Sequence, residues 1–188
     1  MAKALEYNAT LVERVDVTDA LTIFRVQPDQ MPAERPWFVP GQYCVLGCNN
    51  GDKPELGSTR RSMSIASAPE DEGPVEFYIR FVSKPESDNP LTHMLWKLKS
   101  GDRMYMRPVA AGVFTVKDTV GVDDPRLRVL VAAGTGSAPF VSMVRSELRR
   151  NPNADLSKYV LLHSASYPTD LGYHEELIEM IKHNKLKY

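Results

Sequence analysis

The sequence predicts a protein of two parts, an antiparallel β-barrel followed by an incomplete doubly wound α/β unit of the Rossmann type. Over the first 120 residues, short β-rich runs alternate with turns rich in Pro and Gly, which is typical of a small antiparallel barrel. After residue 125 the order becomes strand, helix, strand, helix, which begins a parallel sheet with helical crossovers. We therefore predict a barrel domain over residues 1–120 and an α/β domain over residues 126–188.

The barrel elements follow from alternation and turn signals. A proline-rich loop over residues 28–40 separates the first two strands from the third. The clearest strand covers residues 75–82, with Val75, Phe77 and Ile79 on one face and Glu76 and Tyr78 on the other. A short helix is predicted to start at residue 90 and to stop before residues 100–102. The remaining predicted strands cover residues 7–17, 20–27, 41–46, 61–67, 103–109 and 113–116.

The α/β elements begin with the continuous apolar run at residues 129–133, which is typical of a parallel strand covered on both faces. Ser137 is predicted to cap a helix with one apolar stripe, which ends before Asn151. A strand over 159–163 and a helix over 171–183 follow, the helix acidic at its start and basic at its end. Two strands and two helices are too few for a complete doubly wound sheet, so we expect a C-terminally truncated chain.

Composition and net charge restrict the classes of protein to which this sequence can belong. Of the 188 residues, 43% are hydrophobic and 25% charged, as in an ordinary soluble globular protein. A formal charge of -1 argues against nucleic-acid binding, which needs an excess of Lys and Arg. Neither an apolar run of about 18 residues nor the apolar core of a signal peptide occurs. We expect a cytoplasmic monomer without membrane attachment.

Cysteine and histidine usage predicts no metal site and no disulfide framework. Cys44 and Cys48 are four residues apart in one predicted strand, on the same face, and we expect both to be buried free thiols. The four histidines are scattered, and the sequence His174-Glu175-Glu176 lacks the second histidine of a zinc-binding helix.

Two stretches carry the chemistry of anion binding. Arg61 supplies a guanidinium that can fork onto a pyrophosphate, with the hydroxyls of Ser64 and Ser67 nearby; the alternative is a barrel strand with surface Arg and Ser. The turn at residues 134–136, Gly-Thr-Gly, follows an apolar strand and precedes a helix, where glycines allow close approach of a phosphate. Its alternative is a tight turn without a ligand. Thr92, at the start of the short helix, is a third candidate phosphate contact, or part of an ordinary helix start.

The order of these motifs resembles the ferredoxin–NADP reductase family, most closely its bacterial flavodoxin/ferredoxin reductase branch. The resemblance covers nearly the whole chain, from about residue 7 onward. It rests on residues 40–43 (PGQY), 61–67 (RSMSIAS), 90–92 (PLT), 98–102 (LKSGD) and 134–139 (GTGSAP).

This resemblance implies a flavoenzyme that binds FAD and NADP, with NAD possible, and passes electrons from the nucleotide through the flavin to a ferredoxin or flavodoxin. Arg61 would bind the FAD pyrophosphate, and Ser64, the predicted catalytic residue, would hydrogen-bond near flavin N5. Met63 replaces the stacking aromatic of the family pattern, and Ser166 stands where related chains often carry an Arg for the 2′-phosphate of NADP. The predicted cofactor-binding residues are Arg61, Ser62, Met63, Ser64, Ile65, Tyr78, Ile79, Leu91, Thr92, Gly134, Thr135, Gly136 and Pro139.

Two alternatives stay open. One is a reductase component that delivers electrons to an oxygenase, which needs an iron–sulfur domain whose four cysteines this sequence does not contain. The other is a flavin-binding electron-transfer subunit that does not itself react with pyridine nucleotide, which Met63 and Ser166 favour.

Overall fold

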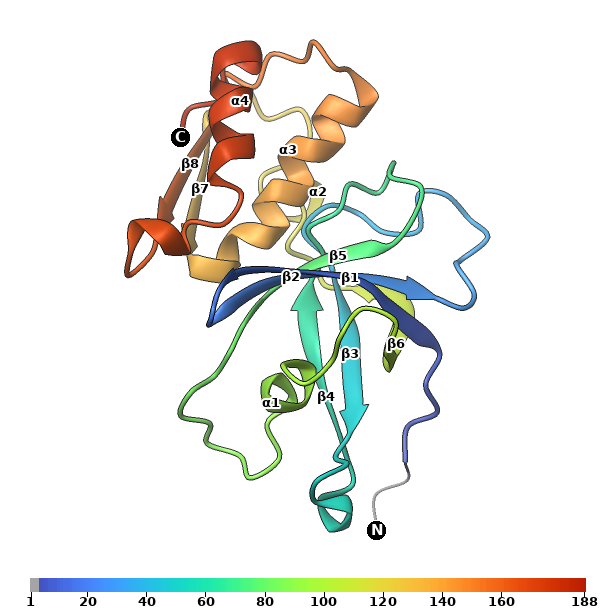
Figure 1. Ribbon diagram of the computed structural model, residues 1–188. Coiled ribbons are helices and arrows are strands. Elements are labelled where there is room, and N and C mark those ends of the chain that lie inside the picture. Colours follow the sequence, from blue (N-terminus) through green and yellow to red (C-terminus); the bar gives the residue numbers. More distant parts are fainter. Residues whose placement is uncertain (1–3) are drawn as a thin grey trace.

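The computed structural model describes residues 4–188, and it confirms an antiparallel β part followed by a smaller α/β part (Figure 1). The first part is a six-stranded antiparallel sheet in the order β4-β3-β6-β1-β2-β5. Its elements are β1 (Ala9–Thr18), β2 (Leu21–Pro28), β3 (Tyr43–Asn49), β4 (Ser58–Ser64), β5 (Val75–Arg80), helix α1 (Leu91–Leu95) and β6 (Arg103–Ala111). The domain limits 1–120 and 126–188 stay predictions.

The sheet curves toward a barrel without closing into one. Its two edge strands, β4 and β5, are joined by a bridge between Ile65 and Phe77, and the Ala66 N–H donates to the Glu76 carbonyl at 2.8 Å. Within residues 4–188 no continuous ladder connects these two strands. The pairing of β4 with β3 ends at Ser64, and the chain then turns away from the sheet, so too few residues remain to pair with β5.

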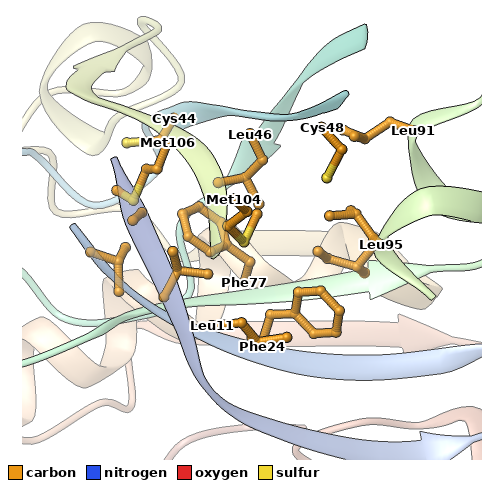
Figure 2. Packing of buried hydrophobic residues seen from close by; sticks show 14 of the residues in the cluster. Leu11, Phe24, Cys44, Leu46, Cys48, Phe77, Leu91, Leu95, Met104 and Met106 are labelled. Atoms are coloured by element: carbon orange, nitrogen blue, oxygen red, sulfur yellow. The ribbon is translucent and has the colours of Figure 1, made fainter. Parts of the chain in front are cut away.

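The core of the β part lies inside this curved sheet, under α1. Figure 2 shows Phe24 and Phe77 packed with methionine and leucine side chains from the facing strands. Cys44 and Cys48 belong to this core as free thiols, which confirms their predicted burial. Burial raises the pKa of both thiols to about 12, so they stay protonated at neutral pH.

The predicted strand at residues 113–116 is wrong. Gly112 has a φ of 105°, a conformation that suits glycine and ends strand β6. Thr115 then caps the short helix α2 (Val116–Thr119), because its hydroxyl oxygen accepts from the Asp118 N–H at 3.1 Å. The same hydroxyl donates to the Asp118 carboxylate at 2.6 Å.

The second part contains two parallel strands with helices on one side. Strands β7 (Arg128–Ala133) and β8 (Tyr159–Ser164) pair in parallel, and α3 (Ala138–Arg150) and α4 (His174–Asn184) pack on one face of the pair (Figure 1). The predicted cover on both faces is wrong, since Val131 is 69% exposed on the other face. Lys187 bridges Val160 in parallel, so the last residues lie beside β8 as a further strand position.

The turn between β7 and α3 differs in detail from the prediction. Ser137 does not cap α3, because its hydroxyl donates to the Gly134 carbonyl at 3.1 Å inside a 3-10 turn (Gly134–Ser137). The second predicted helix starts three residues later than expected, at His174, after Tyr173 in the left-handed conformation. Its predicted first residues form instead the end of a loop over residues 171–173.

A buried ionic network joins the two parts. The Glu76 carboxylate on β5 accepts from Arg145 of α3 at 2.7 Å and from the Tyr173 hydroxyl at 2.9 Å. Arg145 also donates to both carboxylate oxygens of Glu176 at 2.7 Å. Burial would raise the pKa of Glu76, but the charge and hydrogen bonds of Arg145, with help from Tyr173 and Arg25, hold it below its ordinary value. Glu76 is buried in this network, and Tyr78, two residues along β5, is buried under residues 170–173.

Candidate functional site

A groove of about 690 Å³ runs along β4 and β5 and reaches the turn after β7. It brings together predicted residues that lie far apart in the sequence. From the predicted set, the lining residues are Arg61, Ser62, Met63, Tyr78, Ile79, Leu91, Thr92 and Thr135. Both parts of the molecule therefore contribute to one concave site, of the size that ligand pockets commonly have.

Strand β4 contributes the first group of these residues because its outer edge is not paired along its length. Arg61 and Ser62 are exposed, and Met63 is half-buried against the core of the β part. The Arg61 guanidinium donates to the Arg60 carbonyl at 2.8 Å and to the Thr59 hydroxyl at 3.4 Å. Within residues 4–188 no carboxylate forms an ion pair with it, so its charge is available to an anionic ligand.

Two further cations line the groove that sequence reasoning did not assign. Arg80 ends β5, and Lys84 lies in the loop that connects β5 to α1. Within residues 4–188, neither Arg80, Lys84 nor Arg61 forms an ion pair, and Glu86 is the one carboxylate in the lining. Three cations and one anion favour a polyanionic ligand. The outward position of Arg80 in the alternating strand was the signal that could have identified it.

Tyr78 forms a wall of the groove and is held by the second part of the molecule. Its hydroxyl donates to the Asp170 carbonyl at 3.2 Å, and its ring meets the Tyr173 ring edge-on at 5.3 Å. A Cβ atom on Gly172 would lie 2.4 Å from this ring, so only glycine fits there without movement. Burial raises the pKa of Tyr78 to about 12, so the hydroxyl remains a donor at neutral pH.

Leu91 and Thr92 enter the groove from the start of α1, and both are buried. The Thr92 hydroxyl oxygen accepts from the Val82 N–H at 3.3 Å, which ties the loop over residues 83–90 to β5. The hydroxyl proton remains free to be donated to a ligand.

The turn at residues 134–137 closes one end of the groove through Thr135. Gly134 has a φ of 52°, and a Cβ atom on Gly134 or Gly136 would meet no atom within 4 Å. A ligand can therefore approach the backbone of this turn. The Gly134 carbonyl is fixed by the His163 ring Nε2 at 3.0 Å, and burial lowers the pKa of His163, which favours the neutral ring.

Other predicted residues lie outside the groove lining. Ile65 is fully buried in the core, because the chain bends into the interior where β4 ends. Ser64 is half-buried and pairs with Tyr43, and Pro139 is buried at the start of α3. The Ser67 hydroxyl, expected to face a ligand, accepts instead from the Glu76 N–H at 2.6 Å.

Residues 4–188 offer neither a cluster of metal ligands nor a membrane-spanning helix. They contain no group of three or more His, Cys, Asp or Glu side chains that could hold a metal ion. No helix in this range is both long enough and apolar enough to cross a membrane.

Comparison with known proteins gives one family model and several relatives. Residues 130–188 match the oxidoreductase NAD-binding domain. A flavodoxin/ferredoxin–NADP reductase of Rhodobacter capsulatus is 30% identical over 189 aligned residues, which cover 98% of this chain and 62% of that protein. A methane monooxygenase component C of Methylosinus trichosporium is 36% identical over 141 residues, 74% of this chain and 36% of that protein.

Among solved structures, the flavohem-like FAD/NAD binding domain of a nitric oxide dioxygenase from Vibrio cholerae has a TM-score of 0.75. It is 21% identical, and the match covers 96% of this chain and 71% of that one. The likeness confirms the fold. The chain spans about 62% of the length of the Rhodobacter relative.

Proposed function

We propose that this chain is a member of the ferredoxin–NADP reductase family, which its 30% identity to the Rhodobacter capsulatus reductase supports, and that it binds FAD and a pyridine nucleotide and transfers electrons between them. The observation that carries the proposal is the groove itself. It joins Arg61, Tyr78 and Thr92 of the β part with Thr135 of the NAD-binding part. These residues would hold and orient a flavin, which would supply the chemistry of hydride acceptance and single-electron release.

The residues divide into three roles. Arg61, Arg80 and Lys84 hold the pyrophosphate of FAD, because they are the unpaired cations of the groove. Met63 and Tyr78, which line the groove, supply apolar surface to the flavin. Ser64, outside the lining but directly after Met63 in β4, is the proposed donor of a hydrogen bond near the reactive edge of the flavin.

The turn with Gly134, Thr135 and Gly136 receives the pyrophosphate of the nucleotide, where the absence of side chains leaves room. NADP is the proposed nucleotide, as in the name of the Rhodobacter relative, with NAD as the alternative. Ser166 favours the alternative, because it is exposed and uncharged and offers no cation to a 2′-phosphate.

For the electron acceptor, the Rhodobacter relative supports a ferredoxin or flavodoxin. A second candidate is an oxygenase component, which the 36% identity to a methane monooxygenase component supports. A monomeric state and a cytoplasmic location stay predictions. Reduction of a purified ferredoxin, a flavodoxin and an oxygenase component, each followed spectroscopically with this chain as the reductase, separates the candidates.

The first experiment is an anaerobic visible spectrum of the purified chain with added FAD, before and after NADPH or NADH. We expect a yellow protein that bleaches with nucleotide. Arg61→Gln should lose most of its FAD on gel filtration. Arg60→Gln is the matched control, because Arg60 is the preceding residue of β4 and does not line the groove. Equal FAD retention by the two variants would show that Arg61 does not hold the cofactor. A yellow protein that stays yellow with both nucleotides would support an electron-transfer subunit.

A further inference from the structure

A second pocket, of about 270 Å³, lies between the two parts of the molecule and belongs to a different end of the α/β unit. Its walls include Phe38 and Val39 from the loop before β3, Met143 from α3, and Arg128 at the first position of β7. The proposed nucleotide turn follows the last residue of that strand, Ala133. Six strand residues separate the two ends of β7 by roughly 17 Å. The two sites are therefore distinct.

The pocket has an apolar wall, and its charged lining residues are mostly cations. Its carboxylates, Glu70 and Glu147, both lie near Arg150, at 3.4 and 3.8 Å. Lys117 and Lys158 line the same pocket, and neither they nor Arg128 forms an ion pair within residues 4–188. Within residues 4–188, the pocket therefore contains three cations that form no direct ion pair.

Arg128 is the buried member of this group. It is 6% exposed, its Nη1 donates to the Tyr159 hydroxyl at 2.7 Å, and its Nη2 donates to the Val122 carbonyl at 2.8 Å. Its Nε has no hydrogen-bond partner, the one such buried side-chain atom within residues 4–188. The Tyr159 hydroxyl, which accepts from Nη1, donates its proton to Glu147 at 3.0 Å. A buried N–H donor of a charged group that lacks an acceptor is unfavourable, and an acceptor atom of a bound ligand would satisfy it.

We propose that this pocket binds a small organic anion with an apolar body, such as an aryl carboxylate, whose carboxylate lies among Arg128, Lys117 and Lys158 and whose ring lies against Phe38 and Met143. The charge excess selects an anion, and the apolar wall selects against inorganic ions. Because loop residues of the β part and α3 both line the pocket, such a ligand contacts both parts at once.

The test is isothermal titration calorimetry of the FAD-loaded full chain with phenylacetate, phenylethanol and inorganic phosphate. Phenylethanol has an aromatic ring but no charge, and phosphate has charge but no ring. We expect phenylacetate to bind at least ten times more tightly than either. The double variant Lys117→Gln/Lys158→Gln should weaken phenylacetate binding about tenfold, while Lys99→Gln, an exposed lysine outside the pocket, leaves it unchanged. These surface changes avoid the buried Arg128, whose replacement could unfold the chain.

Three results would overturn the proposal. One is equal affinity for phenylacetate and phenylethanol, which would remove the role of charge. Another is phosphate binding as tight as phenylacetate binding, which would leave a simple anion site. The third is a loss of phenylacetate binding in Arg61→Gln but not in the double lysine variant, which would place the probe in the flavin groove. If only the assignment of the flavin groove were wrong, the double lysine variant would still weaken phenylacetate binding.

Discussion

Replacing Gly172 by Ala should weaken flavin binding by pushing Tyr78 out of place. The added Cβ would lie 2.4 Å from Cζ and Oη of Tyr78 and 2.9 Å from Cε1. Non-bonded carbon atoms prefer separations of about 3.5 Å or more, so the ring has to move by roughly 1 Å. The movement breaks the 3.2 Å hydrogen bond to the Asp170 carbonyl and the edge-on contact with Tyr173. Together these losses amount to about 1–3 kcal/mol of stability.

The consequence for the groove follows from the position of Tyr78 in its wall. A displacement of about 1 Å in an apolar wall removes contacts with the bound ring, and about 1.4 kcal/mol of lost contact raises a dissociation constant tenfold. We therefore expect the FAD dissociation constant, measured by flavin fluorescence quenching, to rise about tenfold. Urea unfolding should report the loss of stability in the same sample.

The matched control is Gly51→Ala, where an added Cβ would meet no atom within 4 Å. A second control is the double variant Gly172→Ala/Tyr78→Val, in which the ring that causes the clash is absent. When Tyr78 is already replaced by Val, adding Gly172→Ala should change the free energy of unfolding little. Such non-additivity is expected of two residues in contact. If Gly172→Ala behaved like Gly51→Ala in both stability and FAD binding, the steric reasoning about Tyr78 would be refuted.

Three further predictions concern the connections within the fold. Arg145→Met should lower the free energy of unfolding in urea by about 3–5 kcal/mol, because it leaves the Glu76 carboxylate buried without its main partner. Arg149→Met, which removes the more exposed ion pair with Asp71, should lower it only slightly. Equal losses in the two variants would contradict the stabilising role of the network. Since the folded pKa of Glu76 is lowered, its contribution is complete above its ordinary pKa of 4.5 and is lost as the pH falls through the folded value. The unfolding temperature should therefore fall as the pH is lowered below 4.5, and it should fall less in Glu76→Gln. The same pH profile of unfolding temperature in both proteins would exclude Glu76 as the source of this dependence. Thr115→Ala should cost about 1 kcal/mol by removing the cap of α2. The comparison is Lys117→Ala, an exposed residue of the same helix, and equal costs would argue against the cap.

The sequence predicted most strands within a few residues, because alternation and turn residues are local signals. It failed where burial depends on distant partners. Tyr78 was assigned to the cofactor site, but the sequence did not show that residues 170–173 pack against its ring. The apolar run of β7 predicted cover on both faces, yet both helices pack on the same face and leave Val131 exposed. Periodicity reports how apolar a segment is, and it does not report what lies opposite.

The residues of the candidate site could likewise be identified from the sequence only in part. Residues 61–63 and Thr135 were assigned from separate motifs, and the fold brings them to one groove. Arg80 and Lys84 were not assigned, because neither belongs to a recognisable phosphate-binding motif. They reach the groove because of the path of the chain at the end of β5 and in the loop before α1. Ile65 was assigned by its place in a motif, but the bend after Ser64 directs it into the core.

The contacts of Tyr78 with Asp170 and Tyr173 imply that the proposed flavin groove depends on the α/β part for its shape as well as for the proposed nucleotide. Strand β5 is held on one side by β2 and on its inner face by Arg145 and Tyr173, which come from α3 and from the residue before α4. A nucleotide that shifts the turn at Gly134 also acts on α3, which starts directly after that turn. Displacement of α3 would be transmitted through Arg145 to Glu76 and so to the groove wall. FAD and nucleotide binding should therefore be coupled, and Arg145→Met should reduce that coupling, measured as the change in FAD affinity on adding nucleotide, more than Arg149→Met does.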